Sequence, residues 1–298
     1  MQAPHPDAFQ FGVMGDAPYY DSEEIDFVAM MGEMNREPLA FVVHVGDFKA
    51  GSDAPCTDAL YVKRKAQFDG LAHPFFFTPG DNDWVDCRRE SNGGSDALER
   101  LAKLRVIFFT HDAARDSRPR KLEATAQREC VERSGDGCRC PGLPENRAWK
   151  MKGVAFVTLH ITGSNNNAGF DAASDREVRC RTRANELWLE RHLRGGDWRA
   201  FVVIIHANPW IRSRERVYDG FLAQIANGAK THARPVLLVH GDTHIHRVDK
   251  PFRDASGKPI ENLTRLETFG SPMVGWVRVT ADPAQSGFFR FAPGKSDF

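Results

Sequence analysis

The segment Phe11–Asp16 (FGVMGD) is a short apolar run that ends in Gly-Asp, and the chain repeats this arrangement three more times. The later copies are FVVHVGD at 41–47, PFFFTPGD at 74–81 and PVLLVHGD at 235–242. Apolar runs of this length, bounded by turn residues, are typical of buried strands. Carboxylates placed just past several strand ends meet at one edge of a sheet, where they repel one another unless cations lie between them. The pattern therefore predicts a polynuclear metal site.

The spacing of the first three aspartates is that of parallel β-α-β units. Asp16 and Asp47 are 31 residues apart, and Asp47 and Asp81 are 34 residues apart, whereas one such unit takes roughly 30 residues or more. Open α/β sheets bind ligands at the carboxyl ends of their parallel strands. In this part of the chain we expect strands alternating with helices, at 10–14, 22–36, 41–45, 57–68 and 75–78.

The second half of the chain continues this rhythm. An apolar run at 201–205 ends at His206, which lies 36 residues before Asp242. Further helices are expected at 96–109, 177–193 and 217–227, with strands at 153–161, 201–205 and 236–239 and β-like alternation over 263–291. No Pro- or Gly-rich linker interrupts the sequence. We therefore expect one α/β domain over 1–298, with a Cys- and Arg-rich insertion at about 110–148.

Composition excludes several classes of protein. The 298 residues contain 40 Lys and Arg against 40 Asp and Glu, so no overall field favours nucleic acid or anionic lipid. No apolar run approaches the roughly 20 residues that a membrane helix needs. We predict no nucleic-acid partner and no membrane span, and the oligomeric state cannot be read. The polar start, 1–7, predicts no signal peptide, and its Gln-Ala-Pro resembles a mature exported N-terminus.

Cysteine usage indicates the compartment. The six cysteines are Cys56, Cys87, Cys130, Cys138, Cys140 and Cys180. An even number permits disulfides in an oxidising compartment, and three of them lie in a segment with little apolar content, which a disulfide would help to hold. Free thiols and a small zinc knuckle, whose fourth ligand cannot be named, are the alternatives. We favour disulfides, and hence a periplasmic or secreted protein over a cytoplasmic one.

The order of these motifs resembles the calcineurin-like metallophosphoesterase superfamily, which includes the purple acid phosphatases. That family has Asp-x-His, Gly-Asp, Gly-Asn-His-Asp/Glu, a lone His after a strand, and Gly-His-x-His, and the resemblance runs from Asp16 to His246. It implies a four-layer sandwich of two mixed β-sheets flanked by helices. It also implies two metal ions, one aspartate (Asp47) bridging them, and these ligands in all: Asp16, Asp47, Asp81, His206, Asp242 and His244.

The chain departs from the family pattern at several positions. Pro18 replaces the His of the first motif, with Tyr19 and Tyr20 next to it, and Asn82 replaces the His that contacts phosphate. Asp242 replaces the first His of the last motif, so His244 with His246 is an alternative to the Asp242–His244 pair. Asn82 is likewise an alternative to Asp81 as ligand. A ligand set this rich in carboxylates favours manganese, iron or magnesium, with zinc as the alternative.

The resemblance implies a metal-dependent phosphoric ester hydrolase, either a phosphatase or a phosphodiesterase. A hydroxide bridging two metal ions would attack phosphorus. The candidate catalytic residues are Asn82, Asp83, Asn165 and His246. Asp83, His246 or water would protonate the leaving group, and the loop containing Asn165 either presents amides to the phosphate or is an ordinary turn. The alternatives are a single-metal phosphodiesterase and a catalytically degraded binding protein of the same fold. The sequence does not identify the substrate.

Overall fold

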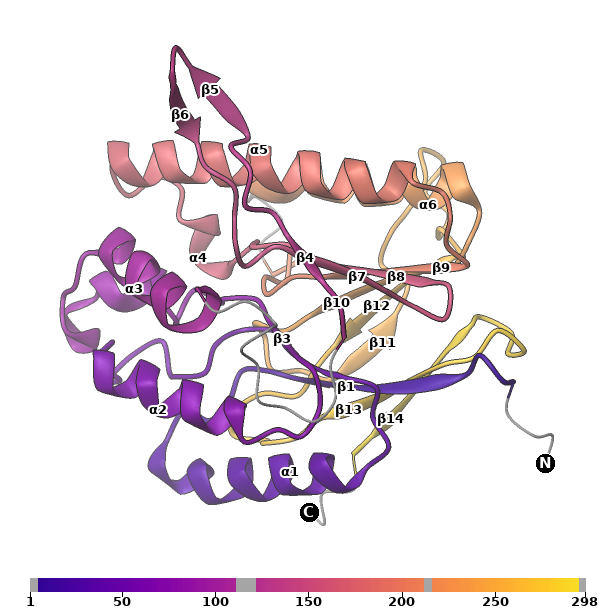
Figure 1. Ribbon diagram of the computed structural model, residues 1–298, viewed down its shortest axis with the longest axis horizontal. Coiled ribbons are helices and arrows are strands. Elements are labelled where there is room, and N and C mark those ends of the chain that lie inside the picture. Colours follow the sequence, from indigo (N-terminus) through magenta and orange to yellow (C-terminus); the bar gives the residue numbers. More distant parts are fainter. Residues whose placement is uncertain (1–4, 111–121, 212–215, 295–298) are drawn as a thin grey trace.

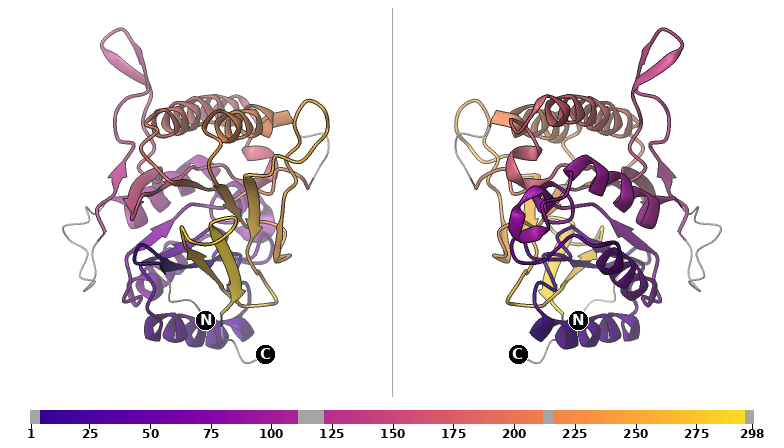
Figure 2. Two further views of the ribbon diagram at one scale, coloured as in Figure 1. Left: turned by 90° about the vertical axis from the view of Figure 1, so that its right-hand side faces the viewer. Right: turned by 90° about the vertical axis from the view of Figure 1, so that its left-hand side faces the viewer.

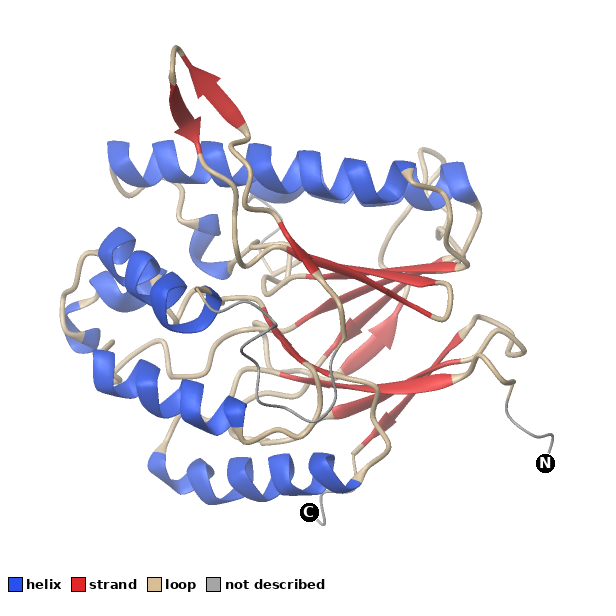
Figure 3. Ribbon diagram, in the orientation of Figure 1, coloured by secondary structure: helices blue, strands red, loops and turns tan. Residues whose placement is uncertain are grey.

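The computed structural model describes residues 5–110, 122–211 and 216–294. Two β-sheets lie face to face in the middle of the molecule, and helices cover the outer side of each (Figure 1, Figure 3). The expected α/β architecture with two mixed sheets and flanking helices is confirmed at this level. The particular fold family and the single-domain organisation stay predictions.

The first sheet has the order β14-β13-β1-β2-β3. Its strands are β1 (Phe9–Met14), β2 (Val42–His44), β3 (Phe75–Phe77), β13 (Val277–Ala281) and β14 (Phe289–Pro293). As predicted, β1, β2 and β3 are parallel, while β13 and β14 add antiparallel strands beside β1. The parallel strands place the residues that follow them at the same edge of the sheet.

The second sheet has the order β11-β12-β10-β9-β8-β7-β4. Its strands are β4 (Thr125–Ala126), β7 (Arg147–Met151), β8 (Val154–Thr158), β9 (Ala200–Ile204), β10 (Val236–His240), β11 (Arg247–Asp249) and β12 (Leu263–Glu267). The central strands β8, β9, β10 and β12 are parallel, and the outer strands are antiparallel to their neighbours. β4 belongs to the predicted insertion, so part of that segment extends the sheet.

Alternation along the strands divides the hydrophobic core into layers. Val13 and Val43 pack between the two sheets, whereas Met14 and Val42 face the helices on the outer side, because neighbouring residues of a strand point to opposite faces. In the layer between the sheets, Phe76 of one sheet stacks on Trp149 of the other, with ring centroids 3.6 Å apart. This packing fixes the two sheets relative to each other.

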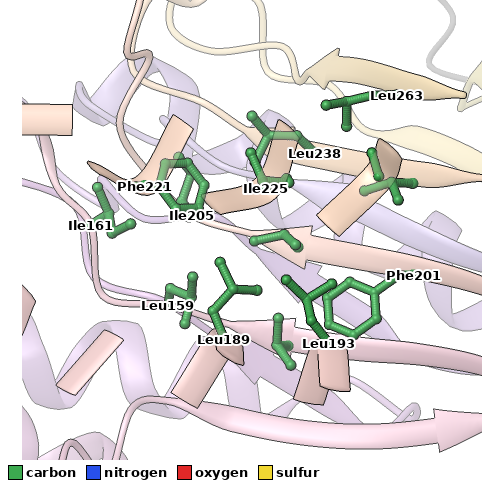
Figure 4. Close-up of a cluster of buried hydrophobic side chains, with 14 of the residues drawn as sticks. Leu159, Ile161, Leu189, Leu193, Phe201, Ile205, Phe221, Ile225, Leu238 and Leu263 are labelled. Atoms are coloured by element: carbon green, nitrogen blue, oxygen red, sulfur yellow. The ribbon is translucent and has the colours of Figure 1, made fainter. Parts of the chain in front are cut away.

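Helices cover both outer faces. On the first sheet lie α1 (Glu24–Arg36), α2 (Asp58–Asp69) and α3 (Ala97–Phe109), and on the second lie α5 (Ala172–Arg194) and α6 (Asp219–His232). Figure 4 shows Leu189 and Leu193 of α5 packed toward Phe201 of β9. The predicted helix at 22–36 begins with a 3₁₀ turn, η1 (Asp21–Glu23). The helix predicted at 177–193 begins earlier because Asp171 caps it, accepting from the backbone N–H of Ser174 at 2.7 Å.

The Cys-rich segment forms a hairpin that projects from the body of the molecule (Figure 2). Its strands are β5 (Glu132–Ser134) and β6 (Gly137–Cys140), and the residues 111–121 of the predicted insertion lie outside the described residues. All six cysteines are paired, as Cys56–Cys87, Cys130–Cys138 and Cys140–Cys180. Disulfides are thus confirmed, against free thiols or a zinc knuckle, and they favour an oxidising compartment. Within the described ranges, no helix has the length and hydrophobicity to cross a membrane.

Candidate metal centre

Five strand ends, from both sheets, deliver polar side chains to one place. Asp16, Asp47 and Asp81 follow β1, β2 and β3 of the first sheet, while His206 and Asp242 follow β9 and β10 of the second. Two groups of three have ligand atoms within 4.8 Å of one another, Asp16–Asp47–His206 and Asp81–His206–Asp242. The structure therefore brings together five of the six ligands that the sequence singled out, in groups able to hold a metal ion.

The backbone at these strand ends is unusual. Asp16, Asp47, Asp242 and His244 have φ angles of 52°, 57°, 81° and 61°, in the left-handed region that non-glycine residues seldom occupy. Residues held in this region cluster at functional sites, where surrounding structure fixes them. Here the left-handed residues redirect the chain after β1, β2 and β10.

His206 is the centre of the arrangement. It is fully buried, and its Nδ1 lies 2.9 Å from the carbonyl oxygen of Val45. A carbonyl only accepts, so Nδ1 carries a hydrogen, and in the neutral ring Nε2 offers its lone pair, the arrangement usual for a histidine that binds metal. Nε2 lies 2.9 Å from Asp81 Oδ1, 3.4 Å from Asp47 Oδ2 and 4.0 Å from Asp242 Oδ1. It therefore faces three carboxylates.

Asp16 and His244 form the other side of the site. Oδ1 of Asp16 accepts from the backbone N–H of Asp242 at 2.9 Å, whereas the buried Oδ2 has no hydrogen-bond partner among the described residues. His244 lies outside both groups of three, yet its Nε2 is 3.8 Å from Asp16 Oδ1. Its Nδ1 donates to the carbonyl of Ser271 at 2.7 Å. A buried carboxylate oxygen without a donor is costly, and a cation would satisfy it.

Tyr19 enters the site from the turn after β1. Its hydroxyl lies 3.2 Å from Asp47 Oδ2 and 3.0 Å from His244 Nε2, and it accepts from Asn82 Nδ2 at 3.0 Å. The neighbouring Tyr20 is 59% exposed and has no such contact in the hydrogen bonds of the described residues. The sequence placed both tyrosines next to the first motif without distinguishing them.

Glycines are required where backbone packs against the carboxylates. A Cβ on Gly80 would lie 2.0 Å from Asp47 Oδ1, and a Cβ on Gly241 would lie 2.1 Å from Asp16 Oδ2. Real Cβ atoms do not approach other atoms this closely, so only glycine fits at these close approaches. The Gly of each of these Gly-Asp pairs therefore leaves room for the carboxylate of an aspartate that follows a different strand.

Electrostatics shows that the site needs positive charge. Burial raises the pKa of Asp16 and of Asp47 well above the usual value, and it raises the pKa of Asp242 to about 7. Burial disfavours the charged form of His206, but Asp47, Asp81 and Asp242 outweigh it and raise the His206 pKa well above the usual value. Protons compensate these carboxylates when nothing else does, and metal ions are the alternative source of positive charge.

Asp83 lies behind the site rather than in it. It is fully buried, and its oxygens accept the backbone N–H groups of Asp47, Phe48 and Gly80 at 3.0, 2.9 and 2.7 Å. Burial raises its pKa to about 6. Asp83 thus fixes the turns that carry Asp47 and Asp81. Its role as proton donor to a leaving group stays a prediction, and this geometry argues against it.

Asn82 lies within the site. Its backbone N–H donates to Asp47 Oδ1 at 3.0 Å, and its side-chain amide donates to Tyr19 and to the carbonyl of Lys49. Asn82 therefore contacts the site through the Asp47 carboxylate and the Tyr19 hydroxyl. The alternative in which it replaces Asp81 as ligand has less support, because Asp81 and not Asn82 lies beside His206.

The other two catalytic candidates have different surroundings. The Asn165 amide donates to Ala168 O at 3.0 Å, within the turn around α4 (Gly163–Asn166). From that turn it is Ser164 that reaches the site, with Oγ 2.8 Å from Asp81 Oδ2, and no sequence pattern indicated it. His246 donates from Nδ1 to Glu267 O and stacks on Phe269. The geometry therefore favours the Asp242–His244 pair over His244–His246.

Comparisons with known proteins leave these assignments to the structure itself. The chain matches no family model and no curated protein.

A cavity of about 180 Å³ between α5 and α6 is lined by Ile161, Tyr218 and Phe221 among others and includes none of the residues of the candidate metal centre.

Proposed function

We propose that this protein is a metal-dependent phosphoric ester hydrolase of the calcineurin-like metallophosphoesterase type. The observation that carries the proposal is the convergence of Asp16, Asp47, Asp81, His206 and Asp242 from five strand ends. The donor set is mainly carboxylate oxygen with imidazole nitrogen, which suits manganese, iron or magnesium. Two such ions supply Lewis acidity and a nucleophilic hydroxide at neutral pH when bound.

The candidate ligands form two groups, one for each proposed metal ion. Asp16 and His244 would hold one ion, with the Tyr19 hydroxyl next to them, and Asp81, His206 and Asp242 would hold the other. Asp47 lies between the two sides, since its Oδ2 is near both the Tyr19 hydroxyl and His206. An aspartate in this position supports two ions rather than one.

Protonation of the leaving group sets the expected substrate preference. Among the described candidates, Asp83 and Asn165 are engaged with backbone groups, and His246 uses one ring nitrogen on Glu267. None of these three side chains is thus evident as a strong proton donor. Esters with good leaving groups, such as aryl phosphates, need little protonation and should be hydrolysed fastest.

The test is hydrolysis of 4-nitrophenyl phosphate and bis(4-nitrophenyl) phosphate by the protein loaded with manganese or iron, with Asp47→Ala as the inactive comparison. Hydrolysis that Asp47→Ala abolishes supports the hydrolase. Tight binding of a single ion by Asp47→Ala would instead indicate a one-metal phosphodiesterase. A protein that binds no metal and hydrolyses neither ester is the degraded binding protein.

A further inference from the structure

An arginine stands at the edge of the metal centre. Arg89 follows the short 3₁₀ turn η2 (Val85–Arg88), eight residues after Asp81. Its Nη1 donates to the carbonyl of Gly51 at 2.6 Å, and its Nη2 lies 2.8 Å from Asp86 Oδ2. About half of the side chain, 48%, is still exposed. The guanidinium is therefore held in place while part of it faces solvent.

Two chains of contacts connect Arg89 to the metal centre. In the first, Asp86 Oδ1 lies 2.8 Å from Ser164 Oγ, which lies 2.8 Å from Asp81 Oδ2. In the second, a Cβ on Gly51 would lie 3.2 Å from Arg89 Nη1 and 2.5 Å from Asn82 Oδ1. The Arg89 guanidinium and the Asn82 amide therefore both pack closely around Gly51, with no room for a side chain between them.

The nearby lysine does not offer an equivalent charge. Lys49 is 1% exposed, and its ammonium donates to the carbonyls of Ala50 and Asn82. The Lys49 ammonium is thus buried beneath the turn that carries Asn82, and its charge is not available to a bound anion. Arg89, in contrast, is held by two contacts and has further N–H groups, since a guanidinium carries five. It is suited to a bound anion.

We propose that Arg89 binds a non-bridging phosphoryl oxygen of the substrate and makes the protein selective for phosphate monoesters over diesters. The inference rests on the proposed hydrolase function. A monoester has three non-bridging oxygens and, near neutral pH, a charge close to −2, whereas a diester has two such oxygens and one charge. With two oxygens directed to the cation site, a monoester presents a charged third oxygen to Arg89. A diester presents an ester substituent there.

The test compares Arg89→Met and Arg89→Lys with Arg199→Met, in the metal-loaded protein. Arg199 is a matched control, since it is 54% exposed, is paired with Asp7 at 2.6 Å and lies just before β9, at the opposite end of that strand from His206. The measurements are kcat/KM for 4-nitrophenyl phosphate and for bis(4-nitrophenyl) phosphate, and the inhibition constant of inorganic phosphate. Melting temperatures identify any variant that fails to fold.

We expect Arg89→Met to lower kcat/KM for the monoester by about 10- to 100-fold and to leave the diester within about threefold, as loss of one charge-assisted contact predicts. Inorganic phosphate should bind more weakly by a similar factor. Arg89→Lys keeps the positive charge but loses the planar guanidinium with its paired N–H donors, so its kcat/KM for the monoester should be intermediate. Arg199→Met should match the unsubstituted protein.

Equal losses for both esters would overturn the proposal, because Arg89 would then act only by positioning neighbours. Unchanged kinetics and unchanged phosphate binding would overturn it as well. If the unsubstituted protein hydrolyses neither ester, the proposed function fails, and direct binding of inorganic phosphate decides the role of Arg89 separately. Weaker phosphate binding by Arg89→Met would then support the contact, and equal binding would refute it.

Discussion

The Nδ1 atom of His206 donates to the carbonyl oxygen of Val45 at 2.9 Å. Val45 directly follows β2 of the first sheet and His206 lies two residues after the end of β9 of the second, so this hydrogen bond joins the two sheets at their ligand-bearing edges. It also fixes the tautomer in which Nε2 faces Asp47 and Asp81. The packing of the sheets and the chemistry of the site thus depend on the same contact.

Tyr19→Phe should weaken metal binding while leaving the fold intact. The hydroxyl contacts both Asp47 and His244, and loss of such a supporting contact costs about 10- to 100-fold in metal affinity. Competition with a chelating dye measures the affinity. Tyr20→Phe, at the exposed neighbouring position, is the control and should bind normally. Equal affinities for the two variants would exclude Tyr19 from the site.

Gly80→Ala should damage the site directly. The new methyl would lie 2.0 Å from Asp47 Oδ1 and 2.7 Å from the Asp47 backbone nitrogen, so the two turns must separate. Overpacking of this kind destabilises by about 1–3 kcal/mol. We expect a lower melting temperature and reduced metal content. Gly137→Ala in the hairpin, where the nearest atom is 3.6 Å away, should change neither, and normal metal binding by Gly80→Ala would contradict this packing.

The disulfide Cys56–Cys87 should stabilise the site as well as the fold. It closes a loop of 31 residues that contains Asp81, and chain-entropy arguments give about 3–4 kcal/mol for such a loop. Replacing both cysteines by Ser should lower the free energy of unfolding by this amount and weaken metal binding. The same replacement at Cys130 and Cys138, whose separation is 8 residues, should lower stability less and leave metal affinity unchanged. Urea unfolding and dye competition separate these outcomes.

The free energy of unfolding should fall in acid because His160 is buried in its uncharged form. Burial lowers the pKa of His160 to about 4, although Glu145 opposes the shift. The unfolded chain takes up that proton near pH 6.5, so between pH 6.5 and 4 the unfolded state binds more protons and stability is lost as the pH falls. The contribution is about 3 kcal/mol over this range.

His160→Gln should therefore flatten the dependence of stability on pH, even if it lowers stability at pH 7. His232→Gln, at the half-buried last residue of α6, is the control and should follow the unsubstituted protein. Denaturant unfolding at pH 7, 5.5 and 4.5 measures the difference between the curves. Parallel curves for His160→Gln and the control would refute the assignment.

The sequence predicted the strand ends well because the spacing of β-α-β units determines where they lie. Asp16, Asp47 and Asp81 had to reach one edge once their strands were parallel, and His206 and Asp242 followed the same rule in the second sheet. Tyr19, Ser164 and Arg89 could not be found this way. Their positions depend on left-handed turns and on contacts between the two sheets, which no local pattern encodes.

Residue type alone was a poor guide to role. Asp83 has the chemistry of a proton donor, but three backbone amides use its oxygens. Asn165 lies in the right loop, yet it is the neighbouring Ser164 that contacts Asp81. The hairpin β5–β6 has no apolar periodicity, and two disulfides take the place of a core there. Side-chain partners, rather than composition, decide these functions.

The most direct test of the metal centre is elemental analysis of the protein after loading with manganese or iron and removal of excess ion. The two sides of the site predict about two equivalents per chain, lost largely in His206→Ala and Asp47→Ala and retained in the control Arg199→Met. A protein that takes up no metal, or whose metal content is the same after His206→Ala and Asp47→Ala, would contradict the account.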